Sequence, residues 1–319
     1  MAGFAFVRWL TCLALALPVL IGPLAPAEAG SPLGAPRFAA VLMDADTNEI
    51  LFAEQAGAIR HPASITKVMT LYMVFDALDA GRLRLTDRVV MSPRAVSQRP
   101  SKLGLGVGQS LSVDEAISVV AVKSANDVAV ALAEKVGGTE ANFAKLMTMK
   151  ARQLGMRQTV FANASGLPDP AHFTSAQDIA TLSAAMIRNH PNYYHCFSAP
   201  SYSFGRLRMV NHNKLLGNVV GLDGIKTGFT NDSGFTLTAS AIRGGRRLIA
   251  VVLGSPSSSQ RNRDVTALLN AGFTALDIRR RGGTGDMPAL LSSAGFTLNR
   301  SLRSAPQIAA IDIEEGDGE

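Results

Sequence analysis

Cysteine is scarce in this chain, and its histidines are scattered. Of the 319 residues only two are cysteines, Cys12 and Cys196. Because Cys12 falls in the signal peptide predicted below, Cys196 is left alone. An internal disulfide is therefore excluded, and we expect Cys196 to pack as a buried hydrophobic residue. The five histidines have no paired spacing of the zinc-binding kind and no acidic cluster beside them, so the sequence predicts no metal site.

Glutamate is absent between Glu140 and Glu314, and aromatic residues make up only 6% of the chain. The net charge is +6, and it stays +6 without residues 1–29, which hold Arg8 and Glu28. Nucleic-acid binding would require a concentrated basic patch with aromatic platforms, so we predict no nucleic-acid partner. A dispersed basic charge instead favours a loose, peripheral association with anionic wall polymers or membrane surfaces.

The N-terminus has the pattern of an export signal. An uncharged run from Trp9 to Ala27 follows Arg8, and Ala27-Glu28-Ala29 has the small-x-small form of a cleavage site. We predict a signal peptide over 1–29, and with it export to the bacterial periplasm or cell envelope. An uncleaved membrane anchor is the alternative, although three prolines interrupt the run near the cleavage site.

With 47% apolar residues, the remaining chain is long enough for one large core. Alternating apolar residues predict a hairpin of strands 39–44 and 49–53, and two neighbouring strands at 235–241 and 247–253. A helix over 261–276 is expected to close the fold. The sequence thus predicts an α+β domain over 33–276, with an antiparallel sheet facing a helical subdomain. Residues 279–319, from an arginine run to an acidic end, are predicted to be a disordered tail.

The first of three short motifs is Ser64-Ile65-Thr66-Lys67, which stands before an apolar run without glycine or proline. That run predicts a buried helix opened by Ser64 and ending before Gly81. Three residues apart on a helix, the Ser64 and Lys67 side chains lie on one face, so Lys67 can serve as the base that a serine nucleophile requires. A lysine acts as a base only when burial or a second cation lowers its pKa, and Lys226 is the candidate cation. The alternative for Ser64 alone is a helix N-cap.

The other two motifs are Ser124-Ala125-Asn126, at a predicted break between two helices, and Lys226-Thr227-Gly228, before a strand. Ser124 is a candidate to pass a proton to a leaving amine, and Asn126 to bind a substrate amide. Lys226 and Thr227 are candidates for binding a carboxylate. Gly228 lets a ligand backbone approach, and the N–H groups of Phe229 and Ser64 can form an oxyanion hole. Alone, the two motifs would be a plain turn and a glycine-rich hairpin; in this order with Ser64 and Lys67 they indicate a serine acyl-transfer enzyme.

These motifs resemble those of the serine D-alanyl-D-alanine carboxypeptidases, the low-molecular-mass penicillin-binding proteins with a β-lactamase/transpeptidase-like fold. The resemblance covers about residues 33–275 and includes segments 62–64, 163–167, 211–216 and 223–228. It implies a site between the sheet and the helical subdomain, no cofactor, peptidoglycan stem peptides ending in D-Ala-D-Ala as substrate, and β-lactams as covalent inhibitors. It also implies that Arg261 binds the terminal carboxylate of the substrate. Phe229 departs from the pattern, because many relatives have histidine there.

Three alternatives stay open at this point. A glutamate-dependent β-lactamase is disfavoured by the missing glutamates, but a lysine-dependent one is not. A D,D-endopeptidase would use the same bond and the same residues. A non-catalytic binder of wall peptides or β-lactams is disfavoured because Ser64 and Lys67 occur together. His61, just before the first motif, is a candidate to line the cleft, while the other histidines are expected at surface or structural positions.

Overall fold

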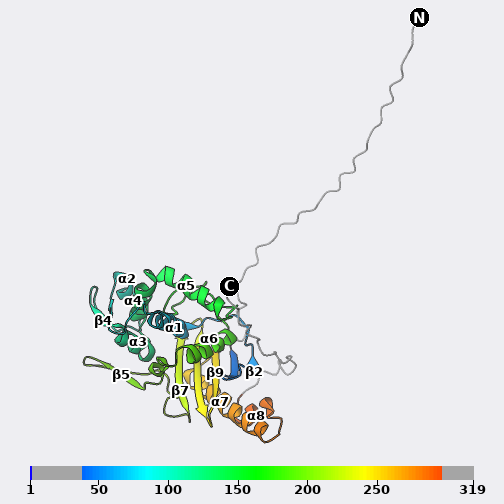
Figure 1. The fold of residues 1–319 in the computed structure, drawn as a ribbon. Coiled ribbons are helices and arrows are strands. Elements are labelled where there is room, and N and C mark those ends of the chain that lie inside the picture. The colour runs from blue at the N-terminus through cyan, green and yellow to red at the C-terminus, as the bar shows by residue number, and fades with distance from the viewer. Residues whose placement is uncertain (2–37, 297–319) are drawn as a thin grey trace. The chain divides into compact units, whose positions relative to one another are not determined.

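The computed structural model describes Met1 and residues 38–296 of the chain (Figure 1). The predicted signal peptide, apart from Met1, and residues 297–319 of the predicted tail lie outside the described residues. Among the helices that are described, none is both long and apolar enough to cross a membrane.

A five-stranded antiparallel sheet forms one half of the described chain (Figure 1). Its strand order is β2-β1-β9-β8-β7, so β7 is an edge strand. The predicted hairpin is confirmed, because β1 and β2 pair antiparallel. In its turn, the side chain of Asp44 accepts hydrogen bonds from the N–H groups of Asp46 and Thr47. The predicted pairing of the two later strands is confirmed as well. The strands are β1 (Ala39–Asp44), β2 (Ile50–Glu54), β7 (Leu222–Thr230), β8 (Gly234–Arg243) and β9 (Arg246–Ser255).

Alternate side chains of the sheet point to two different hydrophobic clusters. In β9, Leu248, Ala250 and Val252 pack with residues of α7 (Ser258–Arg280), whereas Ile249, Val251 and Leu253 pack with the helices of the opposite face. This period of two buries both faces of the sheet. The closing helix is longer than the predicted 261–276, because the side chain of Ser257 caps its first turn.

The helical half is built around α1 (Thr66–Asp79), which is apolar on nearly all sides and buried by its neighbours. The predicted buried helix ending before Gly81 is therefore confirmed. The other helices of this half are α2 (Pro93–Val96), α3 (Val113–Val122), α4 (Asn126–Gly137), α5 (Glu140–Gln153) and α6 (Ala176–Asn189), with the 3-10 turns η1 (Ala63–Ile65) and η2 (Tyr194–Phe197). Two small two-stranded sheets, β3–β4 (Arg88–Val90, Ser110–Ser112) and β5–β6 (Ser201–Phe204, Leu207–Val210), complete it.

The predicted disorder from residue 279 is wrong for the start of that segment. Residue 279 still belongs to α7, and a further helix, α8 (Met287–Ser293), packs against α7. Met287, Leu291 and Phe296 are buried there, and the Phe296 ring makes edge contacts with Phe38 and Phe52. This segment is too short for its apolar residues to form a clear helical face. Its helical structure therefore depends on packing against α7.

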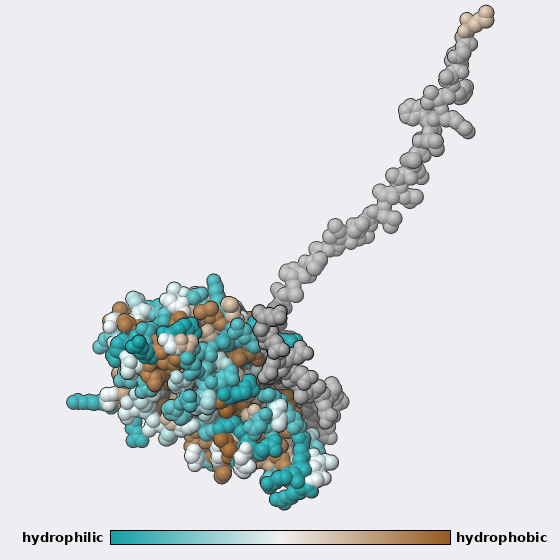
Figure 2. Space-filling model, in the orientation of Figure 1, coloured by the Kyte–Doolittle hydropathy of each residue, from teal (hydrophilic) through white to brown (hydrophobic). Residues whose placement is uncertain are grey.

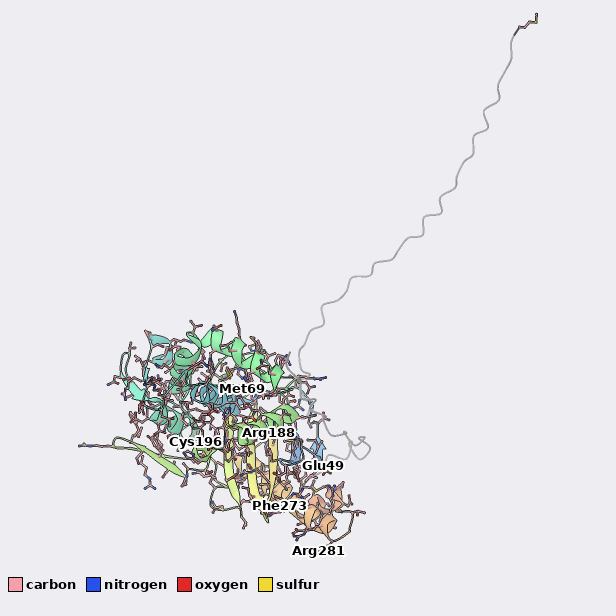
Figure 3. The ribbon with its side chains drawn as sticks, in the orientation of Figure 1. Glu49, Met69, Arg188, Cys196, Phe273 and Arg281 are labelled. Carbon is pink, nitrogen blue, oxygen red and sulfur yellow. The ribbon has the colours of Figure 1, made fainter. Side chains whose placement is uncertain are left out.

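Cys196 lies in η2 and is buried, as predicted (Figure 3). Burial raises the pKa of its thiol far above the usual value, which suits a packing role and not a nucleophile. On the face shown in Figure 2, apolar residues are scattered among polar ones, as is usual for a protein surface.

Candidate active site

Ser64 and Lys67 meet at the junction of η1 and α1. Ser64 lies in the 3-10 turn and Lys67 in the first turn of the helix, and Lys67 Nζ is 3.1 Å from Ser64 Oγ. No side chain caps either element, so the N-cap alternative for Ser64 is wrong. The serine side chain is turned to the lysine instead.

The Lys67 amine has two further neighbours that fix its direction. It donates to Asn126 Oδ1 at 2.7 Å and to the carbonyl oxygen of Ser165 at 2.6 Å. A neutral amine has two N–H donors and one lone pair. With both donors engaged, the lone pair of a neutral Lys67 faces the Ser64 hydroxyl.

The surroundings of Lys67 favour that neutral form. The side chain is fully buried, and this burial lowers its pKa well below the usual lysine value. The positive charge of Lys226 lowers the pKa further, while the Asp127 carboxylate opposes both effects. The direction of this effect agrees with the role of second cation predicted for Lys226, although burial has the larger effect.

The predicted break between two helices lies at Ser124-Ala125, between α3 and α4. Ser124 has a positive φ of 61°, a backbone conformation that is costly for a residue with a side chain and frequent at functional sites. Its hydroxyl is buried and has no hydrogen-bond partner among the described residues. Asn126 is held from the other side, since its Nδ2 donates to the carbonyl of Arg99 at 2.9 Å.

The opposite wall of the site is the edge strand β7. A Cβ on Gly228 would lie 2.8 Å from Ser64 N and 2.7 Å from Thr236 Oγ1, so only glycine lets the strand run this close to Ser64. Lys226 is buried two residues earlier. Burial, and then the charge of Arg261, lower the pKa of Lys226 to about 7.

Arg261 reaches the same wall from the first turn of α7. Its Nη1 lies 3.4 Å from the carbonyl oxygen of Thr236, and its Nη2 donates to Asn262 Oδ1 at 2.7 Å. These contacts hold the guanidinium in place, and burial lowers its pKa to about 10. It remains a cation at neutral pH.

These elements enclose a cleft of about 400 Å³ between the helical half and the sheet. All the predicted site residues line it except Lys67 and Lys226, which lie buried beneath its surface. No aspartate or glutamate of residues 38–296 lines this cleft, whereas Lys214 and Arg261 do. The cleft is therefore suited to an anionic ligand. In the same part of the chain, no group of three His, Cys, Asp or Glu side chains is placed to hold a metal ion.

The family model of D-alanyl-D-alanine carboxypeptidases matches residues 33–257 of the chain. The chain belongs to this family. It is 35% identical to the D-alanyl-D-alanine carboxypeptidase DacF of Bacillus subtilis over 239 residues, which are 74% of this chain and 61% of that protein. It is 38% identical to DacD of Escherichia coli over 252 residues, 76% of this chain and 65% of that protein. The chain thus spans less than two thirds of the length of these relatives.

Solved structures agree with the predicted penicillin-binding-protein fold. Penicillin-binding protein 5 of Haemophilus influenzae superposes with a TM-score of 0.72 at 36% identity, covering 76% of this chain and 72% of that one. Penicillin-binding protein D2 of Listeria monocytogenes, solved in a cefotaxime-bound form, has a TM-score of 0.68 at 30% identity and is covered completely, over 76% of this chain. The α+β fold of the family, with its site between sheet and helices, is therefore confirmed.

Sequence reasoning missed several residues of this carboxypeptidase-family site. Ser165 contributes its backbone carbonyl, and a Cβ on the neighbouring Gly166 would overlap Ala63 O, so this loop packs tightly against the turn that contains Ser64. His212 and Lys214 line the cleft, although neither had been assigned to it. The signal was present, since segments 163–167 and 211–216 carry part of the family resemblance.

The expectation for His61 is wrong for the main cleft. The residue lines a small adjoining pocket, where its Nδ1 lies 2.8 Å from the carbonyl oxygen of His172.

Proposed function

We propose that this protein is a serine D-alanyl-D-alanine carboxypeptidase that removes the terminal D-alanine from peptidoglycan stem pentapeptides. The observation that carries the proposal is the directed Lys67 amine, whose two donors are engaged and whose third position faces Ser64 Oγ at 3.1 Å. Membership of the family and the cationic cleft support it.

In the first half of the reaction, Ser64 Oγ attacks the carbonyl carbon of the D-Ala–D-Ala bond and its proton passes to Lys67 Nζ. The carbonyl oxygen becomes an oxyanion that accepts hydrogen bonds from the N–H groups of Ser64 and Phe229. When the intermediate collapses, the C–N bond breaks. The leaving amine takes the proton from Lys67 by way of the Ser124 hydroxyl, and free D-alanine departs from an ester on Ser64.

In the second half, water attacks the ester carbonyl and gives its proton to Lys67. Collapse of this intermediate breaks the bond to Ser64 Oγ, which recovers the proton from Lys67, and the shortened peptide leaves as an acid. Asn126 binds the substrate amide through both halves. Lys226, Thr227 and Arg261 hold the terminal carboxylate, with Arg261 able to make two parallel hydrogen bonds.

A β-lactam would follow the same first half but keep its leaving group tethered, so it would stay on Ser64 as a slowly hydrolysed ester. The lining of the cleft supports slow release, because no carboxylate among the described residues is in place to activate water. A fast glutamate-dependent β-lactamase is disfavoured on this ground.

We further propose that residues 1–29 direct export to the bacterial periplasm or cell envelope, where the stem peptides are. The catalytic domain then comprises residues 33–296, which extends the predicted 33–276 by the end of α7 and by α8.

Intact-mass spectrometry of the purified protein before and after benzylpenicillin tests the proposal, with Ser64→Ala in parallel. D-Alanine release from diacetyl-L-Lys-D-Ala-D-Ala is followed in the same samples. A stable adduct together with D-alanine release, both lost in Ser64→Ala, is the expected result. Rapid penicillin turnover without an adduct would favour the β-lactamase, and neither adduct nor release from folded protein would leave a non-catalytic binder.

A further inference from the structure

Phe229 is an aromatic residue whose side chain faces solvent within the cleft. It is 51% exposed, although it follows directly after Gly228, where β7 lies close against Ser64. Phe235 on β8 is its partner in the strand register, and the two ring centroids are 4.3 Å apart. Both rings line the cleft. Together, Phe229 and Phe235 form what we call the aromatic pair.

The aromatic pair is next in the strand register to a backbone contact of Arg261, and all three residues line the same cleft. The next register pair along the two strands is Gly228 with Thr236, and Arg261 Nη1 lies 3.4 Å from Thr236 O. The aromatic pair is therefore one residue along the strands from the contact of Arg261. Ser258 and Asn262, from the same turn of α7 as Arg261, line the cleft as well.

A cation next to an apolar surface is complementary to the C-terminal residue of a peptide. In such a residue the carboxylate, which the cation can bind, and the side chain, which the apolar surface can contact, are attached to the same carbon. If the carboxylate is bound at Arg261, the side chain lies within a few ångströms of the bound group. A methyl group covers little of an aromatic ring. A branched or aromatic side chain would cover more of it and would remove more apolar surface from water.

We propose that the aromatic pair is a subsite for the side chain of the C-terminal D-residue, and that it selects for apolar side chains larger than the methyl group of alanine. The inference rests on the proposed carboxypeptidase function. The substrate class is then peptides ending in D-Ala-D-Xaa, where Xaa is an apolar residue such as D-leucine or D-phenylalanine.

The test compares kcat/KM for diacetyl-L-Lys-D-Ala-D-Xaa with D-alanine, D-leucine and D-phenylalanine as Xaa, on the protein, Phe229→Ala and Phe229→Leu. The ratio of two substrates on one variant is the measured quantity, because it cancels any change in folded fraction or in the oxyanion hole formed by the N–H of residue 229. Leu85→Ala, at an exposed apolar position that does not line the cleft, is the matched control.

For the unaltered protein, kcat/KM for the D-leucine peptide is expected to equal or exceed that for the D-alanine peptide. Phe229→Ala should lower the ratio of kcat/KM for the D-leucine peptide to that for the D-alanine peptide by roughly fivefold to tenfold. This is at or below the lower end of the range for a lost apolar contact, because Phe229 is half exposed. Phe229→Leu, which keeps an apolar surface, and Leu85→Ala should retain the ratio within about twofold.

Other outcomes overturn the inference. An unchanged ratio in Phe229→Ala would show that the ring does not contact the terminal side chain, and an increased ratio would show that it obstructs larger residues. In both cases, continued hydrolysis of the D-alanine peptide leaves the carboxypeptidase function standing. Absence of hydrolysis of every peptide, together with no penicillin adduct on folded protein, would refute both proposals.

Discussion

The two walls of the cleft differ in how firmly their polar groups are held. On the helical wall, formed by η1, α1 and the break between α3 and α4, the Lys67 amine has three polar neighbours within 3.1 Å. On the strand wall, formed by β7, β8 and the first turn of α7, the Lys226 amine has one such neighbour among the described residues, Thr227 O at 3.3 Å. The helical wall is fixed in advance for proton transfer, and the strand wall leaves groups available for the substrate.

The two buried lysines show this difference most clearly. Burial is the largest cause that lowers the pKa of each. Lys67 has its donors engaged by Asn126 and Ser165, whereas the hydrogen-bond acceptor that the described residues offer to Lys226 is Thr227 O at 3.3 Å. Lys226 can therefore still turn to a carboxylate, and a bound carboxylate would favour its charged form. In the proposed mechanism, one lysine serves as a base and the other as an anion site because their partners differ.

Replacing the base should have the largest effect. Lys67→Met keeps an unbranched side chain in the buried site but removes the proton acceptor, so the rate of acylation by benzylpenicillin should fall by about 10³-fold or more. Stopped-flow measurement of the adduct gives this rate. Lys150→Met, whose lysine pairs with Asp76 on the far side of α1 from the site, is the control and should acylate normally. Acylation of Lys67→Met at the original rate would mean that another group takes the proton.

Replacing Lys226, in the proposed anion site of the strand wall, should have the second-largest effect on activity. Lys226→Met removes a charge-assisted contact to the substrate carboxylate, which predicts a loss of about 100-fold in kcat/KM. The change also removes a repulsion that lowers the pKa of Lys67. That pKa therefore rises, and the acid limb of the pH–rate profile moves to higher pH.

The pH profile separates these two effects of Lys226. Lys214→Met, at the other cleft-lining lysine, is the control, because Lys214 is not among the charges that shift the pKa of Lys67. Its acid limb should stay in place. An acid limb that is unmoved in Lys226→Met would show that the two lysines are not electrostatically coupled in solution.

Arg261 is expected to contribute less, because Lys226 and Thr227 still hold the carboxylate in its absence. Arg261→Ala should raise KM by about tenfold with little change in kcat, since the contact is already made in the ground state. Arg261→Lys keeps the charge but not the two parallel donors, and should recover only part of the loss. Steady-state kinetics on the diacetyl tripeptide measure both variants. A fall in kcat with an unchanged KM would mean that Arg261 stabilises the transition state. The strand wall would then contribute to the chemical step and not only to substrate binding.

The sequence predicts the parts of this site that depend on side-chain chemistry. Ser64 and Lys67 are recognisable because a serine nucleophile requires a base and a helix brings residues three apart onto one face. Of the two strands in the strand wall, β8 is recognisable from its alternating apolar residues. The sequence predicts Lys226-Thr227-Gly228 to lie before a strand, whereas the structure has them within β7, which lacks that alternation. Arg261 is different, since only the family resemblance indicated that a residue beyond β9 returns to the cleft.

The parts that were not predicted depend on backbone groups and packing partners. Ser165 binds Lys67 through a carbonyl that every residue type has, so its identity gives no signal. The same holds for the carbonyl of Arg99 that fixes Asn126. Residues 287–296 lack a helical pattern of their own and are ordered by contacts with α7, Phe38 and Phe52, which the sequence does not bring together.

The smallest effect on activity is expected from replacing Glu140, which does not line the cleft. Its buried carboxylate accepts the N–H of Ala164 at 3.2 Å, and the carbonyl of Ala164 accepts the Thr70 hydroxyl at 2.7 Å. This places Ser165, the next residue, against Lys67. Glu140→Ala leaves a buried N–H without an acceptor, which should cost about 1–3 kcal/mol of stability and lower kcat by roughly threefold to tenfold with KM retained.

Glu140→Gln is the matched variant, because its amide oxygen can still accept the Ala164 N–H, and it should recover most of kcat. Arg94 donates to the same carboxylate through Nε and Nη2, so Arg94→Ala leaves this buried carboxylate without its cation and should lower stability, but it should retain kcat because the bond to the Ala164 N–H remains. Thermal unfolding and steady-state kinetics on the three variants distinguish positioning from general stability. If Glu140→Ala lost stability but kept kcat, the helical wall would tolerate a displaced Ser165 carbonyl, and Asn126 alone would suffice to direct the Lys67 lone pair.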